Sequence, residues 1–211
     1  MIEVIQDMIV QGTPEWFEAR CGRATASRFK DILAKTKTGP STSRKNYAAQ
    51  LVCERLTGKV EPSYTNAAMQ WGTDQEPFAR MALEQQGIVV DEVGFLRHDV
   101  LEAGASPDGL IDSDGMVEIK CPNTATHIET LMGGMPSGHM AQIQGQLWIA
   151  QREWCWFVSY DPRMPEKMQL FTERVMRDDK YIGDLQSEVS LFLAEVNTTV
   201  ARLKEKYNGI V

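Results

Sequence analysis

The sequence predicts an α/β (or α+β) fold in which a central mixed β-sheet is flanked by helices. The period of the hydrophobic residues is helical in the first part of the chain, strand-like in the middle and helical again towards the C-terminus. Helices, three strands, a helix, two strands and a last helix in this order are typical of a sandwich of helices on a sheet. The predicted strands are 88–97, 103–111, 116–120, 154–160 and 168–175, and the later helices are 137–151 and 178–207, with a break near Gly183 left open.

Helical signals dominate the first part of the chain. Thr13 precedes Pro14, which is the usual order of an N-cap and a first-turn proline. Thr73 and Glu76 have the spacing of a Thr-x-x-Glu capping box, which predicts that a helix begins there. One predicted helix begins at Thr13, and three others span 25–34, 44–56 (ending near Gly58) and 73–86. Residues 36–43 are predicted to form a loop.

The most informative segment is a predicted β-hairpin around the turn Asp112–Gly115. Asp-Gly turns between short apolar runs are a strong hairpin signal. Strand residues two apart share a face, so Glu118 and Lys120 point the same way while Ile119 points into the core. Asp108, at the start of the partner strand, then lies near both. Two carboxylates and an amine at one place can hold Mg²⁺ and orient a water, as phosphodiester hydrolysis requires.

The same hairpin has a simpler interpretation. Pro107-Asp108-Gly109 is by itself a turn signal, and alternating Glu and Lys usually mark the solvated face of an edge strand. The spacing alone therefore leaves both interpretations open, and the choice depends on whether other residues complete a site.

Several residues could complete such a site. Glu76 either closes the capping box or supplies a third carboxylate. Lys120 is either a surface lysine or the group that orients the attacking water, and it would also remove a proton if desolvation lowered its pKa. The backbone carbonyl of Ile119 is an acceptable ligand for a hard cation.

Phosphate contacts are expected at the start of the predicted helix 25–34. Arg20 and Ser27 bracket that start, where free N–H groups and an arginine fork attract phosphate. Ser106 is either a turn hydroxyl or a further phosphate contact. Gln142 is either solvent-facing on its helix or lies across the site.

Charge and composition narrow the classes of function. The net charge is -7, yet residues 20–59 carry ten basic and two acidic side chains, which gives +8 there and -15 elsewhere. This segment is either a local groove for a polyanion or a solvated helical surface. Met69 is either a core residue or a wedge between bases at a DNA end. Four scattered cysteines, three histidines without ligand spacing and no long apolar run predict a chain of the cytoplasm, not bound to a membrane.

Taken in order, these segments resemble the lambda exonuclease family, the YqaJ-like viral recombinases of the PD-(D/E)xK nuclease superfamily. The resemblance covers residues 12–190, and the combination of blocks is far more specific than any one of them. The matching blocks are Ala24–Ser27, Trp71–Glu76, Ser106–Leu110, Glu118–Pro122, Met140–Gln144 and Tyr160–Met164.

The resemblance implies a restriction-endonuclease-like core and a Mg²⁺-dependent exonuclease that degrades duplex DNA from a 5′ end, leaving a 3′ overhang. It implies two Mg²⁺ ions, with Mn²⁺ as a substitute, a ring-shaped homotrimer around DNA, and a phage-type single-strand annealing protein as partner in a bacterial host. By position, the metal ligands would be Asp108, Glu118 and the Ile119 carbonyl, with Glu76 supporting and Lys120 as the catalytic lysine. The 5′-phosphate would be held by Arg20, Ser27, Ser106 and Gln142, with Met69 as the strand-separating wedge.

The sequence also departs from the family. Residues 123–127 stand where the lambda enzyme carries an arginine that aids tracking, and the C-terminal helix is divergent, so processivity and trimer contacts stay open. We expect one nuclease domain over residues 1–211, with an N-terminal helical DNA-binding portion. The alternatives are an endonuclease of the same superfamily and a non-catalytic DNA-end-binding module that recruits an annealing protein.

Overall fold

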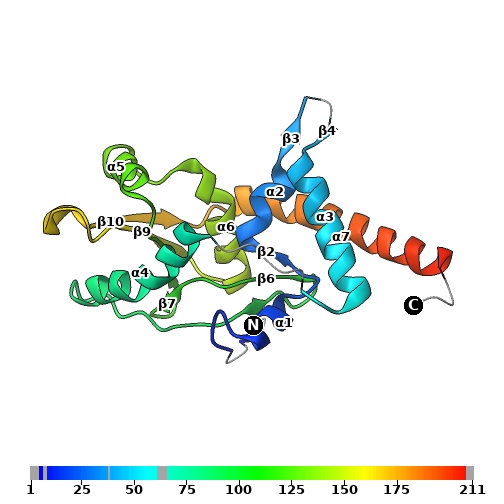
Figure 1. Cartoon of the computed structure of the whole chain (residues 1–211), viewed down its shortest axis with the longest axis horizontal. Coiled ribbons are helices and arrows are strands. Elements are labelled where there is room, and N and C mark those ends of the chain that lie inside the picture. Colours follow the sequence, from blue (N-terminus) through cyan, green and yellow to red (C-terminus); the bar gives the residue numbers. More distant parts are fainter. Residues whose placement is uncertain (1–4, 7–8, 38, 61–65, 208–211) are drawn as a thin grey trace.

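The computed structural model describes residues 5–6, 9–37, 39–60 and 66–207 (Figure 1). The helices are α1 (Pro14–Arg20), α2 (Phe29–Leu33), α3 (Thr42–Thr57), α4 (Ala67–Glu84), α5 (Thr124–Gly133), α6 (Met140–Ala150) and α7 (Asp179–Lys206), with 3-10 turns η1 (Ala26–Arg28), η2 (Ser137–His139) and η3 (Glu166–Met168). The strands are β1 (Ile5–Gln6), β2 (Ala24–Thr25), β3 (Lys35–Thr36), β4 (Gly39–Pro40), β5 (Leu96–Arg97), β6 (Ala103–Ala105), β7 (Gly109–Ile111), β8 (Gly115–Lys120), β9 (Trp154–Tyr160) and β10 (Leu170–Met176). None of the described helices is long and apolar enough to span a bilayer.

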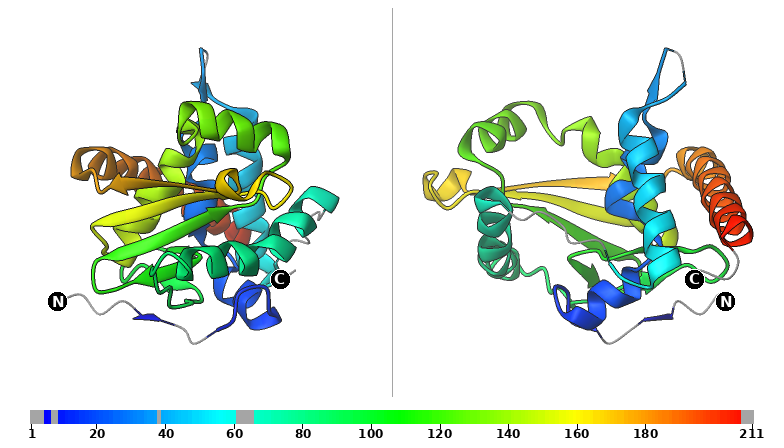
Figure 2. Two further views of the ribbon diagram at one scale, coloured as in Figure 1. Left: turned by 90° about the vertical axis from the view of Figure 1, so that its left-hand side faces the viewer. Right: turned by 45° about the vertical axis from the view of Figure 1, so that its right-hand side comes forward.

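The main sheet has the strand order β10-β9-β8-β7. β9 pairs with β10 and β7 with β8 in antiparallel fashion, whereas β8 and β9 run parallel, so the sheet is mixed. A second sheet of order β1-β5-β6-β2 includes the parallel pair β2 and β6. Figure 2 shows helices on both faces of the strands, which confirms the predicted mixed α/β architecture.

Helix α6 is the central helix of the fold, and residues 143–150 are all buried. A side chain at Gly145 would place its Cβ 2.4 Å from the ring of Phe29, so only glycine allows η1 and α2 to pack this closely on α6. On the far side of α2, the rings of Tyr47 (α3) and Phe192 (α7) stack with centroids 5.5 Å apart. One apolar core therefore holds α2, α3, α6 and α7 together.

The predicted strand 103–111 is wrong as a single element. It divides into β6 and β7, which belong to different sheets, and Ser106, Pro107 and Asp108 form the crossing between them. Of the predicted strand 88–97, only β5 and an isolated bridge from Asp91 to Leu110 pair as strands. The alternation of apolar residues indicates which residues are buried. It does not indicate where the chain leaves one sheet and enters another.

Three helix boundaries also differ from the prediction. The predicted helix 25–34 begins later, because Thr25 lies in β2 and η1 precedes α2. The expected loop 36–43 holds part of the β3–β4 hairpin and the start of α3. Helix α4 begins after Asn66, whose side chain caps the N–H of Met69, so the capping box at Thr73 is wrong.

Helices α3 and α7 agree more closely with the predicted bounds, whereas α5 was not predicted. Helix α3 ends at Gly58 in the left-handed conformation, and α7 runs unbroken through Gly183. Helix α5 was not expected from the sequence; Asn123 caps it by accepting from the N–H of Thr126.

Candidate active site

Glu118 and Lys120 lie on β8, an interior strand of the main sheet. Glu118 is 1% exposed, and Ile119 packs on the other face with Val117 and Cys121 in an apolar cluster. The predicted alternation across the strand is confirmed. The alternative of a solvated edge strand is wrong, because β8 has a neighbour on each side and its acidic residue is buried.

Asp108 is held directly beside these residues. Its backbone N–H donates to the carbonyl of Val117 at 3.1 Å, and its Oδ2 accepts from the N–H of Ile119 at 2.6 Å. Burial and the charge of Glu118 raise the pKa of Asp108 well above its usual range. Two carboxylates that repel each other in this way are placed to share a cation.

Lys120 supplies a positive charge between the two carboxylates. Its Nζ forms an ion pair with Oε1 of Glu118, and its side chain remains 31% exposed. Burial lowers the pKa of Lys120, but Glu118 and Asp108 outweigh this effect and raise it. This charged state suits Lys120 to orienting a water and balancing charge, and its role in removing a proton stays a prediction.

Two glutamines of α6 fix the orientation of Glu118. Nε2 of Gln142 donates to Oε1 at 2.5 Å, and Nε2 of Gln146 donates to Oε2 at 2.6 Å. Gln142 was expected at the phosphate and donates to Glu118; its phosphate contact stays a prediction. Gln146 was missed, although its i, i+4 spacing from Gln142 on one helix face was visible in the sequence.

Glu76 lies in the interior of α4, so it does not cap the helix. Burial raises the pKa of Glu76, while Lys120 lowers it and Glu118 raises it again. Glu76 therefore interacts electrostatically with Lys120 and Glu118, and its role as a third carboxylate of the site stays a prediction.

A cavity of about 520 Å³ is lined by three of the five predicted DNA-binding residues, Arg20, Ser27 and Met69. Arg20, in the last turn of α1, lies 3.9 Å from the ring centroid of Trp16, and burial lowers its pKa to about 10. Ser27 lies on η1, which leads directly into α2, so it is near the start of that helix; its phosphate contact stays a prediction. The lining residues are Trp16, Phe17, Arg20, Arg23, Thr25, Ser27, Arg28, Tyr47, Gln50, Leu51, Glu54, Val60 and Met69.

Ser106 joins the cavity to the carboxylates. Its Oγ accepts from Nε1 of Trp16 at 2.9 Å and from Nη1 of Arg20 at 3.4 Å. Asp108 follows two residues later. Met69 is 51% exposed on the rim, which excludes the interpretation of it as a core residue.

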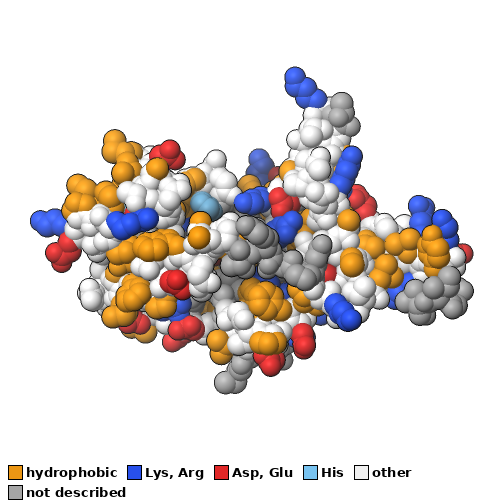
Figure 3. Space-filling model, in the orientation of Figure 1, with side chains coloured by type: hydrophobic (Ala, Val, Ile, Leu, Met, Phe, Trp, Pro, Cys, Tyr) orange, Lys and Arg blue, Asp and Glu red, His pale blue; other side chains and the backbone are white. Residues whose placement is uncertain are grey.

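Basic side chains continue from this cavity along the segment 20–59. In Figure 3 they extend to the β3–β4 hairpin, which projects from the body of the molecule. Arg28, Lys35, Arg44 and Arg55 of this segment form ion pairs with acidic residues, and the surface for a polyanion stays a prediction.

The donor atoms suit a hard divalent cation. Among the described residues no group of three or more His, Cys, Asp or Glu side chains lies close enough to form a complete metal shell. Asp108 and Glu118 nevertheless offer carboxylate oxygens at one place, and their mutual repulsion would be relieved by a cation. The residues present therefore fit Mg²⁺ or Mn²⁺ completed by water, backbone and substrate oxygens.

The arrangement of Glu118 and Lys120 on β8, with Asp108 bonded to the backbone of Ile119, suits a nuclease. Residues 15–153 match the YqaJ-like viral recombinase domain, and the chain belongs to that family. The alkaline exonuclease LHK-Exo of Laribacter hongkongensis is 48% identical to this chain, with a TM-score of 0.86 over 94% of this chain and 100% of that one. The chain is thus a nuclease of the exonuclease class.

Two further structures support the fold. LHK-Exo in complex with dAMP gives a TM-score of 0.87, with the same identity and coverage. A phage-related exonuclease from Haemophilus somnus 129PT is 15% identical, with a TM-score of 0.69 over 86% of this chain and 96% of that one, and it shares the fold alone.

Proposed function

We propose that the protein is a Mg²⁺-dependent exonuclease that degrades one strand of duplex DNA from its 5′ end and leaves a 3′ single-stranded overhang. One observation carries the proposal: Ser106 bonds to Trp16 and Arg20 in the cationic cavity, while Asp108, two residues on, lies against Ile119 of β8. A site that holds the terminal phosphate is thereby linked to the site of hydrolysis.

In this proposal Asp108, Glu118 and the carbonyl of Ile119 hold the metal, with Glu76 in support. Bound Mg²⁺, as two ions or with Mn²⁺ as substitute, would activate a water and stabilise the leaving 3′-oxygen. Lys120 would hold that water in line with the scissile bond.

The cavity residues would place the DNA end. Arg20, Ser27 and Ser106 would bind the 5′-phosphate, with Gln142 at the boundary between phosphate and metal. Exposed Met69 would press against the terminal base pair and help separate the strands.

The partners follow from the product and from the family. A 3′ overhang is a substrate for a single-strand annealing protein, and we infer such a partner in the cytoplasm of a bacterial host that carries the gene on a phage or prophage. We also infer a homotrimer that encloses the DNA. The support for both is the resemblance in sequence and the match to the YqaJ-like viral recombinase domain.

The test uses linear duplex DNA with a 5′-phosphate, labelled separately at each strand end and incubated with Mg²⁺. A covalently closed circle and an Asp108→Ala variant run beside it. Loss of label from one strand at its 5′ end, with the circle intact and the variant inactive, is the expected result. Cleavage of the circle would indicate an endonuclease, and binding of ends without digestion would indicate a non-catalytic end-binding module.

A further inference from the structure

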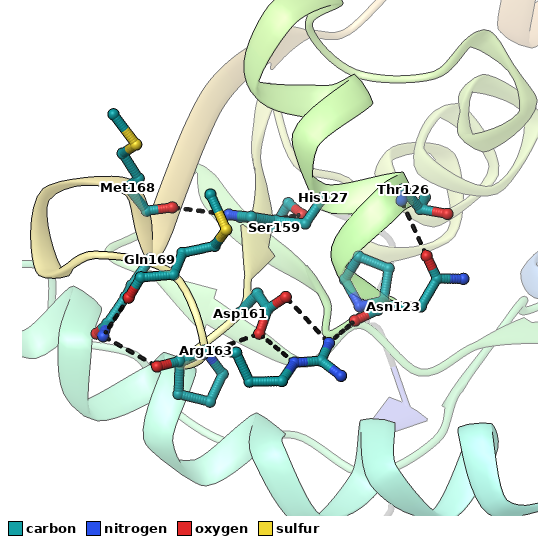
Figure 4. A network of polar contacts seen from close by, with 11 residues as sticks. Asn123, Thr126, His127, Ser159, Asp161, Arg163, Met168 and Gln169 are labelled. Carbon is teal, nitrogen blue, oxygen red and sulfur yellow. Dashed lines mark hydrogen bonds and ion pairs between the residues drawn. The ribbon is translucent and has the colours of Figure 1, made fainter.

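A buried aspartate, Asp161, holds Arg163 in one orientation (Figure 4). Asp161 follows β9 and its side chain is fully buried. Its Oδ1 accepts from the backbone N–H and from Nε of Arg163 at 3.0 and 2.7 Å, and its Oδ2 accepts from Nη2 at 3.0 Å. A guanidinium fixed in this bidentate way keeps its flat face available for another contact.

Arg163 makes two further contacts, with two different parts of the fold. Its Nη2 donates to the carbonyl of Pro122 at 3.1 Å, two residues after Lys120. Its guanidinium carbon lies 4.6 Å from the ring centroid of Trp71 on α4, a cation–π contact. One side chain therefore connects the end of β8 to the first half of α4.

Helix α4 has a second attachment further along. Ala79 and Leu83 are fully buried in the apolar cluster that includes Val117 of β8. Glu76 lies between this attachment and Trp71. A helix held on both sides of a residue restricts where that residue's carboxylate can go.

We propose that Arg163 is a positioning residue, which docks α4 on the end of β8 through Trp71 and so fixes where Glu76 of that helix lies relative to β8. The proposal rests on the proposed function, in which Glu76 supports the metal site. Arg163 itself touches no reacting group in this scheme, so its effect on cleavage passes through Glu76.

The test is a double-mutant cycle on steady-state cleavage of 5′-phosphorylated duplex. We expect Arg163→Lys to lower kcat about tenfold, because lysine loses the planar stack and the bond to Pro122, while KM for DNA stays unchanged. In a Glu76→Gln background the same change should alter kcat less than twofold (about the noise of additive sites). Trp71→Leu alone should also lower kcat about tenfold. Combined with Arg163→Lys, it should lower kcat no further.

Arg174→Lys is the matched control. Arg174 lies 4.2 Å from the ring centroid of Trp154, a contact of the same kind that does not involve α4. We expect it to leave kcat unchanged in both backgrounds. Melting temperatures of all variants separate loss of folding from loss of positioning.

A second measurement needs neither metal nor activity. Backbone amides in the first half of α4 should exchange hydrogen faster in Arg163→Lys than in the parent protein or in Arg174→Lys. Equal exchange, or an equal fold-loss of kcat with and without Glu76, overturns the proposal. If the parent protein itself fails to degrade DNA, the proposed function fails, and faster exchange in α4 still decides whether Arg163 docks the helix.

Discussion

Gln146 donates from Nε2 to Oε2 of Glu118 at 2.6 Å, inside the protein and on the opposite oxygen from the one that Gln142 contacts. Both oxygens of a carboxylate that is almost inaccessible to water are thereby occupied by amide donors. Oε1 of Gln146 is itself buried and has no hydrogen-bond partner among the described residues. Gln146 therefore fixes the orientation of Glu118 while its own Oε1 stays without a hydrogen bond, which costs stability.

Replacing Gln146 with methionine should lower kcat about tenfold, because a buried carboxylate loses a donor and its orientation. Gln144→Met is the control on the same helix. Gln144 bonds to the backbone at Met176 and Asp178 and does not touch Glu118, so its loss should lower the melting temperature and spare kcat. Single-turnover cleavage and thermal melts on both variants check this; a normal kcat for Gln146→Met would contradict it.

Lys120→Ala should reduce cleavage by at least about 100-fold while leaving binding to DNA ends largely intact. The physical reason is that Lys120, held by its ion pair with Glu118, orients the attacking water in the proposed mechanism, and alanine cannot do so. Cleavage is measured in single turnover and binding by fluorescence anisotropy with a 5′-phosphorylated duplex. Lys167→Ala, at an exposed lysine of η3, should change neither quantity, and a Lys120 variant that cuts at the normal rate would remove lysine from the mechanism.

Arg20→Ala should reduce the preference for 5′-phosphorylated over 5′-hydroxyl ends by about tenfold, the value of a charge-assisted contact to phosphate. The ratio of kcat/KM on the two substrates measures it. Arg152→Ala, at an arginine that donates to the carbonyl of Asp112 and does not line the cavity, should leave the ratio unchanged. An equal loss on both substrates would make Arg20 a general anchor for DNA.

Asp161→Asn should destabilise the protein in a pH-dependent way. Burial alone would raise the pKa of Asp161, but hydrogen bonds from Arg163 and Thr124 outweigh it and lower the pKa from 3.8 to about 2. A lowered folded-state pKa stabilises the fold fully above pH 3.8, and this stabilisation disappears as the pH falls towards 2.

The difference in melting temperature between parent and Asp161→Asn should therefore be constant from neutral pH to about pH 5 and shrink below pH 4. Asp179→Asn is the comparison, because Asp179 pairs with Arg177 but is 82% exposed and should matter little at any pH. A gap that widens on acidification would contradict the assignment.

The sequence predicted those parts of the site that depend on local periodicity. Glu118, Lys120 and the turn after Ile111 follow from alternation and turn chemistry, and the structure bears them out. The position of Asp108 near Glu118 could also be predicted, because a hairpin pairs residues that are close in sequence.

What local patterns could not show depends on packing between distant segments. The crossing at residues 106–108 arises because β6 and β7 join different sheets. Helix α4 has Asn66 and not Thr73 as its N-cap. The contact of Arg163 with Trp71 joins residues far apart in the chain, and neither residue type signals it.

The crossing from β6 to β7 has a consequence for the size of the product. Ser106 and Asp108 are separated by two peptide units, and an extended chain covers at most about 7 Å over that distance. In the proposed function, where Ser106 contacts the terminal phosphate and Asp108 holds the metal, this short link would limit the distance between the two contacts. Such a limit would favour products of constant length from DNA ends of any sequence.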